Sequence, residues 1–226
     1  RHGLLYGHPG TGKTAMVVVI HREMDRKWHP VSLYISSGPE WDSAAKAKHT
    51  LWTLARSNDP LVLLIDEIDG VIKSASYVLH EVLTSGSFLD SGKNIFLPPL
   101  TVWGTTNSIA SVPRALRSRF SLKLSYQYYQ PQELAVIAKA SAQRIGMEIS
   151  DEAAEFLGLN GGGEPRKINQ IIQTAKSLRK TIDINTAKEV MEVVDIFPKG
   201  LSRLQVQIML FLINQPRMTG GLTTIA

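Results

Sequence analysis

Three short apolar runs, each followed by polar or glycine-rich residues, occur in the first half of the chain. These runs cover residues 4–6, 61–65 and 100–103, and the second shows no alternation between apolar and polar positions. Strands buried on both faces of a parallel sheet have this pattern. Residues 15–24 form an apolar stretch that suits a helix after the first run. The pattern therefore predicts an α/β fold with a parallel sheet flanked by helices.

The second half of the chain is predicted to be helical. Pro131 begins one helix, and Ser150 caps a second that ends near residue 159. Pro165 suits the first turn of a third helix, in which apolar residues recur at helical spacing. Asn185 is the expected cap of a fourth helix, and residues 201–213 form a fifth.

The residues between the first strand and the first helix fill the phosphate-binding loop pattern G-x-x-x-x-G-K-[ST]. They are Gly7, His8, Pro9, Gly10, Thr11, Gly12, Lys13 and Thr14. Between a strand and a helix, the glycines let backbone N–H groups surround phosphate oxygens at the positive end of the helix. We expect Lys13 to contact the β- and γ-phosphates of ATP and Thr14 to ligate Mg²⁺. A chance glycine-rich turn is the alternative.

Two carboxylates, Asp66 and Glu67, directly follow the second apolar run. The carboxyl ends of strands are where open α/β sheets bind ligands. We expect Asp66 to hold the magnesium through water and Glu67 to polarise the water that attacks the γ-phosphate. Ordinary surface charge at the end of a strand is the alternative, but this position about fifty residues after a phosphate loop favours the catalytic interpretation.

A third strand over residues 100–107 also ends in polar side chains. Asn107 is the better candidate to orient the attacking water beside Glu67, with Thr106 behind it. The alternative is that these residues only end the strand and begin a turn.

Three arginines are candidates for contact with the nucleotide. Arg117 and Arg119 come near the end of the predicted α/β region. Guanidinium groups stabilise the charge on a transferred phosphoryl group, and a neighbouring subunit can supply them. Arg166 falls in the first turn of a helix, where a cation opposes the helix dipole, and that unfavourable position favours a functional role. Solvation at the surface is the alternative for each.

The motifs follow the order found in AAA+ ATPases. After the phosphate loop come Ile-Asp-Glu at 65–67, Gly-Thr-Thr-Asn at 104–107, Ser-Arg-Phe at 118–120 and Gly-Glu-Pro-Arg at 163–166. The chain resembles this family and, within it, the RuvB family of Holliday-junction branch-migration ATPases. The resemblance to RuvB also covers residues 36–39, 97–101, 164–169, 200–204 and 220–222. Asn107 stands where RuvB has arginine.

The resemblance implies three domains and several residue roles. The domains are an AAA+ P-loop core over 1–128, an α-helical lid over 129–194 and the start of a winged-helix domain over 195–226. Arg119 matches the arginine finger that acts on a neighbouring subunit, with Arg117 in the same motif, and Arg166 matches the sensor-2 arginine of the lid. The segment before the phosphate loop contacts adenine in AAA+ proteins, so we expect that segment to precede residue 1.

The resemblance also implies cofactors and partners. It implies ATP and Mg²⁺, a homo-oligomeric ring such as a hexamer, and duplex or branched DNA as the partner. Residues 86–97 are predicted to form a β-hairpin with a Ser-Gly turn, where RuvB has a longer hairpin that binds an accessory protein. Phe88 and Phe96 stand among polar residues there, so they contact a partner or DNA or, alternatively, fold back onto the sheet.

Composition adds limits to this interpretation. The chain has 25 basic and 20 acidic residues, and its net charge of +5 permits a polyanionic partner. It has no cysteine, which excludes thiolate chemistry and fits the reducing cytoplasm, where we expect the protein to act. Its six histidines are scattered, so no structural metal site is expected. The longest apolar stretches, 15–20 and 208–213, are too short to span a membrane.

Two other functions share these motifs. A clamp-loader or initiator-type AAA+ switch would act on DNA without continuous translocation. A nucleotide-stabilised scaffold that does not hydrolyse ATP is the weaker alternative, because it could dispense with Glu67 and both arginines of residues 117–119.

Overall fold

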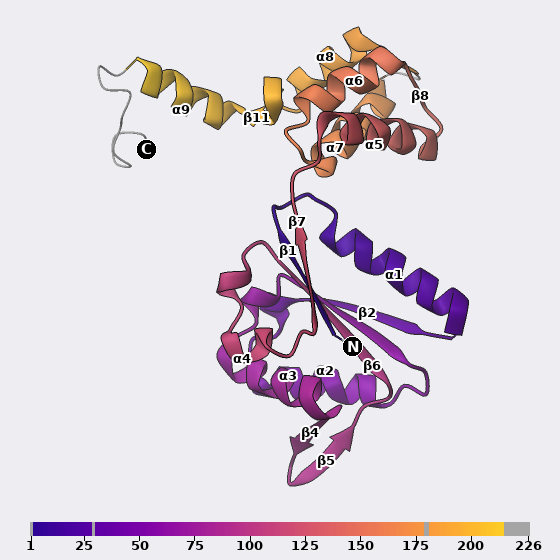
Figure 1. Cartoon of the computed structure of the whole chain (residues 1–226), viewed down its shortest axis with the longest axis vertical. Coiled ribbons are helices and arrows are strands. Elements are labelled where there is room, and N and C mark those ends of the chain that lie inside the picture. Colours follow the sequence, from indigo (N-terminus) through magenta and orange to yellow (C-terminus); the bar gives the residue numbers. More distant parts are fainter. Residues whose placement is uncertain (1, 29, 179–180, 215–226) are drawn as a thin grey trace. The chain divides into compact units, whose positions relative to one another are not determined.

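The computed structural model describes residues 2–28, 30–178 and 181–214. The chain divides into two compact units, Arg1–Gln127 and Tyr128–Ala226. Figure 1 shows the elements of each unit. Within the described residues, no helix is both long enough and apolar enough to cross a membrane.

The first unit is built on a parallel sheet of five strands, in the order β2-β3-β6-β1-β7. Its strands are β1 Gly3–Gly7, β2 Ser32–Ser37, β3 Leu61–Asp66, β6 Leu100–Thr106 and β7 Leu122–Tyr126. Every neighbouring pair in this sheet is parallel. The predicted α/β fold with a parallel central sheet is confirmed.

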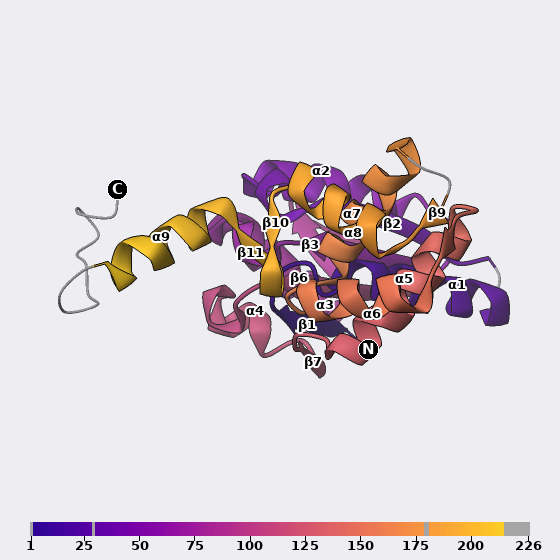
Figure 2. The ribbon, with the colours of Figure 1, turned by 90° about the horizontal axis from the view of Figure 1, so that it is seen from above.

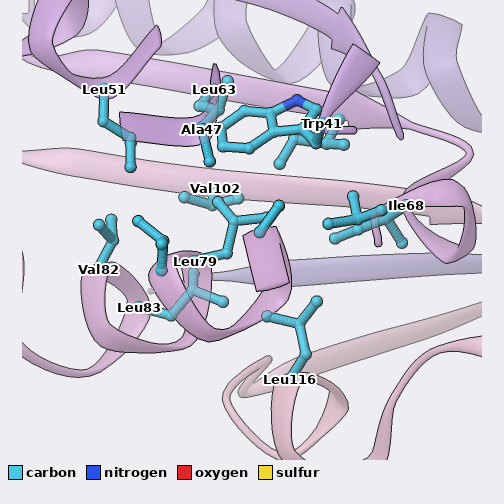
Figure 3. Packing of buried hydrophobic residues seen from close by; sticks show 14 of the residues in the cluster. Trp41, Ala47, Leu51, Leu63, Ile68, Leu79, Val82, Leu83, Val102 and Leu116 are labelled. Carbon is cyan, nitrogen blue, oxygen red and sulfur yellow. The ribbon is translucent and has the colours of Figure 1, made fainter. Parts of the chain in front are cut away.

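Helices cover both faces of this sheet (Figure 1). They are α1 Lys13–Trp28, α2 Ala44–Ala55, α3 Lys73–Ser85 and the short α4 Arg114–Arg117. Successive residues of β3 point to opposite faces. Leu63 therefore joins the core formed with α2 and α3, whereas Leu64 joins the smaller core with α1. Figure 3 shows the larger core, which includes Leu63 of β3, Leu79 of α3 and Leu116 of α4.

The predicted β-hairpin is present and projects from the first unit (Figure 1). Strands β4 Ser87–Asp90 and β5 Lys93–Phe96 pair antiparallel. The turn residues Ser91 and Gly92 have φ of 49° and 77°, and two-residue hairpin turns of type I′ need a positive φ at both positions.

The two phenylalanines of the hairpin have different environments. Phe88 is 0% exposed and belongs to the larger core, whereas Phe96 is 70% exposed. The contact interpretation is therefore wrong for Phe88, because the pleat of β4 turns its ring inward, where it meets Trp52 edge-to-face at 6.4 Å. Trp52 also donates from its indole nitrogen to Asp90, 3.0 Å away. That bond, with help from Lys48, lowers the pKa of the Asp90 carboxyl below its ordinary value.

Replacing Phe88 with alanine should destabilise the protein by about 3–5 kcal/mol, because the substitution removes a fully buried ring and leaves a cavity. The matched variant Phe96→Ala should change stability by less than about 0.5 kcal/mol, since its ring is mostly solvated. Chemical denaturation of both variants measures the difference. Equal effects at the two positions would contradict this account of the hairpin.

The second unit is mainly helical, and helices α5 to α8 lie together in both views (Figure 1, Figure 2). They are α5 Pro131–Arg144, α6 Asp151–Asn160, α7 Pro165–Leu178 and α8 Ile184–Val193. Their apolar faces share one core, which includes Leu134, Leu157, Ile171 and Val190. Ser150 caps α6 as expected. The cap of α8 is Asp183 and not Asn185, because the Asp183 carboxylate accepts the backbone N–H of Thr186 at 2.7 Å.

Short elements complete the second unit. The strands β8 Glu148–Ile149 and β9 Thr181–Ile182 are parallel, and β10 Ile196–Phe197 pairs antiparallel with β11 Leu201–Ser202. Helix α9 Arg203–Ile213 follows, with Ser202 as its cap. Most of the remaining part of the expected winged-helix domain lies outside the described residues.

A close contact between two glycines fixes the turn that precedes Arg166. Gly162 and Gly200 have φ of 62° and 74°, and a Cβ added to Gly200 would lie 2.5 Å from the Cα of Gly162. Any side chain at Gly200 would therefore push the two segments apart. The Lys167 ammonium donates to the Gly200 carbonyl at 2.7 Å and pairs with Glu164 at 2.8 Å. The start of α7 is thus held against the residues that lead to α9.

Candidate nucleotide-binding site

The strand order brings the predicted phosphate loop and the predicted catalytic residues to one edge of the sheet. β6 lies between β1 and β3, with Tyr6 beside Thr106 and Ile65 beside Gly104. Parallel strands end at the same edge, so Gly7, Asp66 and Asn107 follow three adjacent strand ends. Ligands bind at this edge in open α/β sheets.

The phosphate loop has the backbone that its glycines predict. Gly7 has φ of 136°, and a Cβ there would lie 2.0 Å from the Tyr126 carbonyl oxygen, so no larger residue fits. Within the loop, the buried Thr11 hydroxyl donates to the His8 carbonyl at 2.7 Å. His8 and Pro9 are exposed at the tip of the loop. Because α1 begins at Lys13, the first N–H groups of the helix lie at the loop and are available to an anion.

The Lys13 side chain joins the phosphate loop to the end of β6. Its ammonium donates to the carbonyl oxygens of Gly7 at 2.9 Å and His8 at 2.8 Å, and to Oδ1 of Asn107 at 3.0 Å. The lysine is only 8% exposed, whereas Asn107 is exposed. A buried cation therefore lies beside the loop and the amide, in a place that suits the charge of a nucleoside triphosphate.

Asp66 accepts two hydroxyl groups at the end of β3. Thr14 Oγ1 donates to Asp66 Oδ1 at 3.1 Å, and Thr105 donates to the same oxygen. The Thr105 hydroxyl also accepts the Glu67 N–H at 3.3 Å. Thr105 was not a predicted site residue. The alternating side-chain direction along β6 could have indicated it, because Thr105 and Thr106 point to opposite faces of the sheet.

Thr106 and Asn107, both predicted site residues, have different roles. The Thr106 hydroxyl donates to the Ser108 carbonyl at 3.0 Å and accepts the Ser108 N–H at 3.1 Å. Thr106 thus caps the turn after β6, as the alternative interpretation of the sequence stated, and Asn107 alone of the pair contacts Lys13.

Glu67 adopts a left-handed backbone conformation. Its φ and ψ are 53° and 50°, which costs a residue with a Cβ on the order of 1 kcal/mol or more. The bond from the Glu67 N–H to Thr105 stabilises this conformation. Gly38 also packs closely against the backbone of Glu67, since a Cβ on Gly38 would lie 1.9 Å from the Glu67 carbonyl oxygen. The exposed Glu67 carboxylate is free to contact solvent or ligand at the strand edge.

The two arginines near α4 differ in their contacts. Arg117 is half-buried and donates to the Ile109 carbonyl at 3.0 Å, so it supports the turn after β6. Arg119 is exposed, and its Nε donates to Nε2 of His80 at 2.9 Å. Arg166 is exposed at the start of α7 in the second unit.

The residues around Asp66 fit a magnesium ion. Mg²⁺ prefers oxygen ligands and is commonly held by one or two protein groups together with phosphates and water. The Thr14 hydroxyl and the Asp66 carboxylate already meet at the mouth of the phosphate loop. The donor set is therefore the one that a Mg²⁺–nucleotide complex requires.

Comparison with known proteins identifies the family of this chain. Residues 3–128 match the family described as ATPase family associated with various cellular activities (AAA). The chain therefore belongs to the AAA family of ATPases. Within it, the chain falls in the RuvB family, so the predicted membership of the AAA+ ATPases and the likeness to RuvB are confirmed.

The relatives are longer than this chain. The Holliday junction branch migration complex subunit RuvB of Kosmotoga olearia is 30% identical over 100% of this chain and 68% of its own length. RuvB of Staphylococcus saprophyticus is 31% identical over 100% of this chain and 69% of its own. Among solved structures, the Thermotoga maritima RuvB Holliday junction branch migration motor has a TM-score of 0.80 and 27% identity, covering 100% of this chain and 72% of that chain. The P216G mutant of that protein has a TM-score of 0.84 and 28% identity, with 73% of its chain covered.

Proposed function

We propose that this protein is a motor that uses ATP hydrolysis to translocate DNA and drive branch migration of Holliday junctions. One relative is named a Holliday junction branch migration complex subunit, and a solved structure of another is named a Holliday junction branch migration motor. The observation that carries the proposal is the meeting of three strand ends, where Lys13 contacts Asn107 and Thr14 contacts Asp66. Binding and hydrolysis of a nucleoside triphosphate require these groups together.

ATP with Mg²⁺ is the proposed nucleotide complex. Thr14 and Asp66 would hold the ion, which neutralises phosphate charge when bound. Lys13 would exchange its bonds to the Gly7 and His8 carbonyls for the β- and γ-phosphates, because a charged oxygen is the stronger acceptor. Backbone N–H groups of residues 10–14 would surround the phosphates.

Glu67 is the proposed general base. Its carboxylate would accept a proton from the attacking water while the Asn107 amide orients that water against the γ-phosphate. The Lys13–Asn107 bond supports this assignment, since it holds the amide beside the cation that contacts the γ-phosphate. Thr105 would fix the positions of Asp66 and Glu67 together.

Arg119 is proposed to complete the site of a neighbouring subunit in a homo-oligomeric ring, a hexamer. Its exposure and its position two residues after α4 support this role, because the guanidinium must project from the surface of its own subunit to reach a phosphate in the next. Arg117, which bonds to Ile109, would brace the same segment and does not reach out.

The second unit is proposed to turn nucleotide state into movement. Residues 129–194 would form the lid and residues 195–226 the start of a winged-helix domain that meets DNA. Arg166 would contact the nucleotide from the lid. The Lys167 bond to Gly200 supports transmission of lid movement toward α9, since it ties the start of α7 to that segment.

The hairpin is proposed to dock an accessory protein. Leu89 and Phe96 lie on the same outward face and are 52% and 70% exposed. Phe88 and Asp90, on the opposite face, both contact Trp52 of α2, so this apolar face is presented on a rigid support. Phe96→Ala should therefore keep the basal ATPase rate and lose stimulation by a partner or DNA. Full stimulation of this variant would contradict the docking role.

A clamp-loader or initiator-type switch is the second candidate, because Asn107 occupies a position where RuvB has arginine. The ATPase rate with and without DNA separates both enzymes from a scaffold. Branch-point movement in a labelled four-way junction then separates the motor from the switch. A protein that hydrolyses ATP and leaves the junction in place would contradict the proposed motor.

A further inference from the structure

Arg119 is placed by two buried neighbours. Leu116 and Phe120 are each 1% exposed and belong to the core against α3. These anchors fix the short segment between them, so that Arg119 points out of the core. Its own side chain has several rotatable bonds and loses rotamer entropy when it is held in one place.

His80 holds that side chain by one bond. Arg119 Nε lies 2.9 Å from His80 Nε2. A guanidinium group can only donate, so Nε2 of His80 must accept, and the imidazole is neutral with its proton on Nδ1. The bond uses the inner nitrogen of the guanidinium and leaves its two terminal amino groups. Within the described residues, the Arg119 side chain makes no other hydrogen bond or ion pair, and its backbone N–H donates to the Leu116 carbonyl at 3.0 Å.

The helix that carries His80 is a rigid support. Leu79, Val82 and Leu83 of α3 are 0%, 1% and 8% exposed and pack in the larger core. His80 itself is half-buried at the side of this helix. A hydrogen-bond acceptor on such a helix restricts the conformations of the Arg119 side chain much more than water molecules would.

We propose that His80 is a positioning residue for the arginine finger. It fixes Arg119 by Nε so that the two terminal amino groups face the phosphate in the neighbouring subunit before the reaction begins. Preorganised donors stabilise transition-state charge better than donors that must first be ordered. The inference rests on the proposed function of Arg119 and adds a residue that none of the sequence motifs contains.

His80→Leu should lower kcat for ATP by about 10- to 100-fold and leave KM unchanged, because the finger is misplaced but the pocket of the same subunit is intact. His80→Gln should recover most of the rate, since its side-chain oxygen can accept the Arg119 Nε–H. The matched control is His49→Leu on the exposed side of α2, which should keep the parental rate. A His80→Leu protein with the parental kcat, or a His80→Gln protein as slow as His80→Leu, would overturn the proposal.

Mixed rings identify the subunit in which His80 acts. Lys13→Ala subunits have an intact finger and no working pocket, so mixing them with His80→Leu subunits should restore turnover. Arg119→Ala subunits have no finger, so mixing them with His80→Leu subunits should restore nothing. Recovery in the second mixture would show that His80 acts in its own pocket and would overturn the inference.

The same experiment separates this inference from the proposed function. Failure of Arg119→Ala to recover with Lys13→Ala contradicts the shared site itself. Recovery in that mixture, with recovery also between Arg119→Ala and His80→Leu, contradicts the role of His80 alone.

Discussion

Glu67→Gln should bind ATP and turn it over about 10²- to 10⁴-fold more slowly than the parental protein, because the amide cannot accept a proton from the attacking water. Gln keeps the size of the side chain and the bond from the residue 67 N–H to Thr105, so the strand edge should not change. Single-turnover hydrolysis and equilibrium binding of ATP measure the two steps separately. Lys13→Ala should instead lose binding, since the phosphates lose their main cation.

The control for Glu67 is Asp69→Asn, an exposed carboxylate two positions along the same segment. This variant should keep the parental rate, because Asp69 lies in the turn Ile68–Gly70 and is not part of the proposed site. If Glu67→Gln hydrolyses ATP at the parental rate, the assignment of the general base is wrong. If both variants are equally slow, the defect comes from the charge of the segment and not from proton transfer.

Arg119→Ala should keep ATP binding and lose about 10³- to 10⁵-fold in kcat, which is the usual contribution of an arginine finger. The guanidinium acts on charge that develops only in the transition state, so the ground-state affinity should hardly change. Addition of Lys13→Ala protein should restore part of the turnover, because its intact finger enters the intact pocket of an Arg119→Ala subunit.

Arg114→Ala is the matched control, since Arg114 is an exposed arginine on α4 and none of the site motifs contains it. It should keep the parental rate. With mixed rings established by native mass spectrometry, an absence of recovery at every mixing ratio would argue against a finger that acts between subunits.

The parts of the site that depend on neighbouring residues in sequence could be predicted. The phosphate loop, the α/β pattern and Asp66 with Glu67 all follow from local motifs and buried strand runs. The hairpin turn was predictable for the same reason, because Ser-Gly allows two successive positive φ angles.

Contacts between distant residues could not be predicted with the same accuracy. The Lys13–Asn107 bond joins residues 94 positions apart and depends on β6 lying beside β1. Thr105 rather than Thr106 faces Asp66 because of the pleat of β6, and the sequence motif treats the two threonines alike. His80 carries no motif at all, so only the packing of α3 against the segment after α4 brings it to Arg119.

Burial and the path of the chain decided two further cases that the sequence left open. The sequence left open whether Phe88 and Phe96 contact a partner or fold back onto the sheet, and the structure shows one ring buried and the other exposed. At the start of α8, Asp183 and Asn185 are both good caps, and the path of the chain after β9 selects Asp183.

The proposed motor can be tested by the ATPase rate of the full-length protein with a four-way junction, with linear duplex and with single-stranded DNA. We expect Mg²⁺-dependent turnover that a four-way junction stimulates most, branch-point movement in the same mixture, and loss of both in Glu67→Gln. A turnover rate that no DNA changes, with the junction left in place, would contradict it.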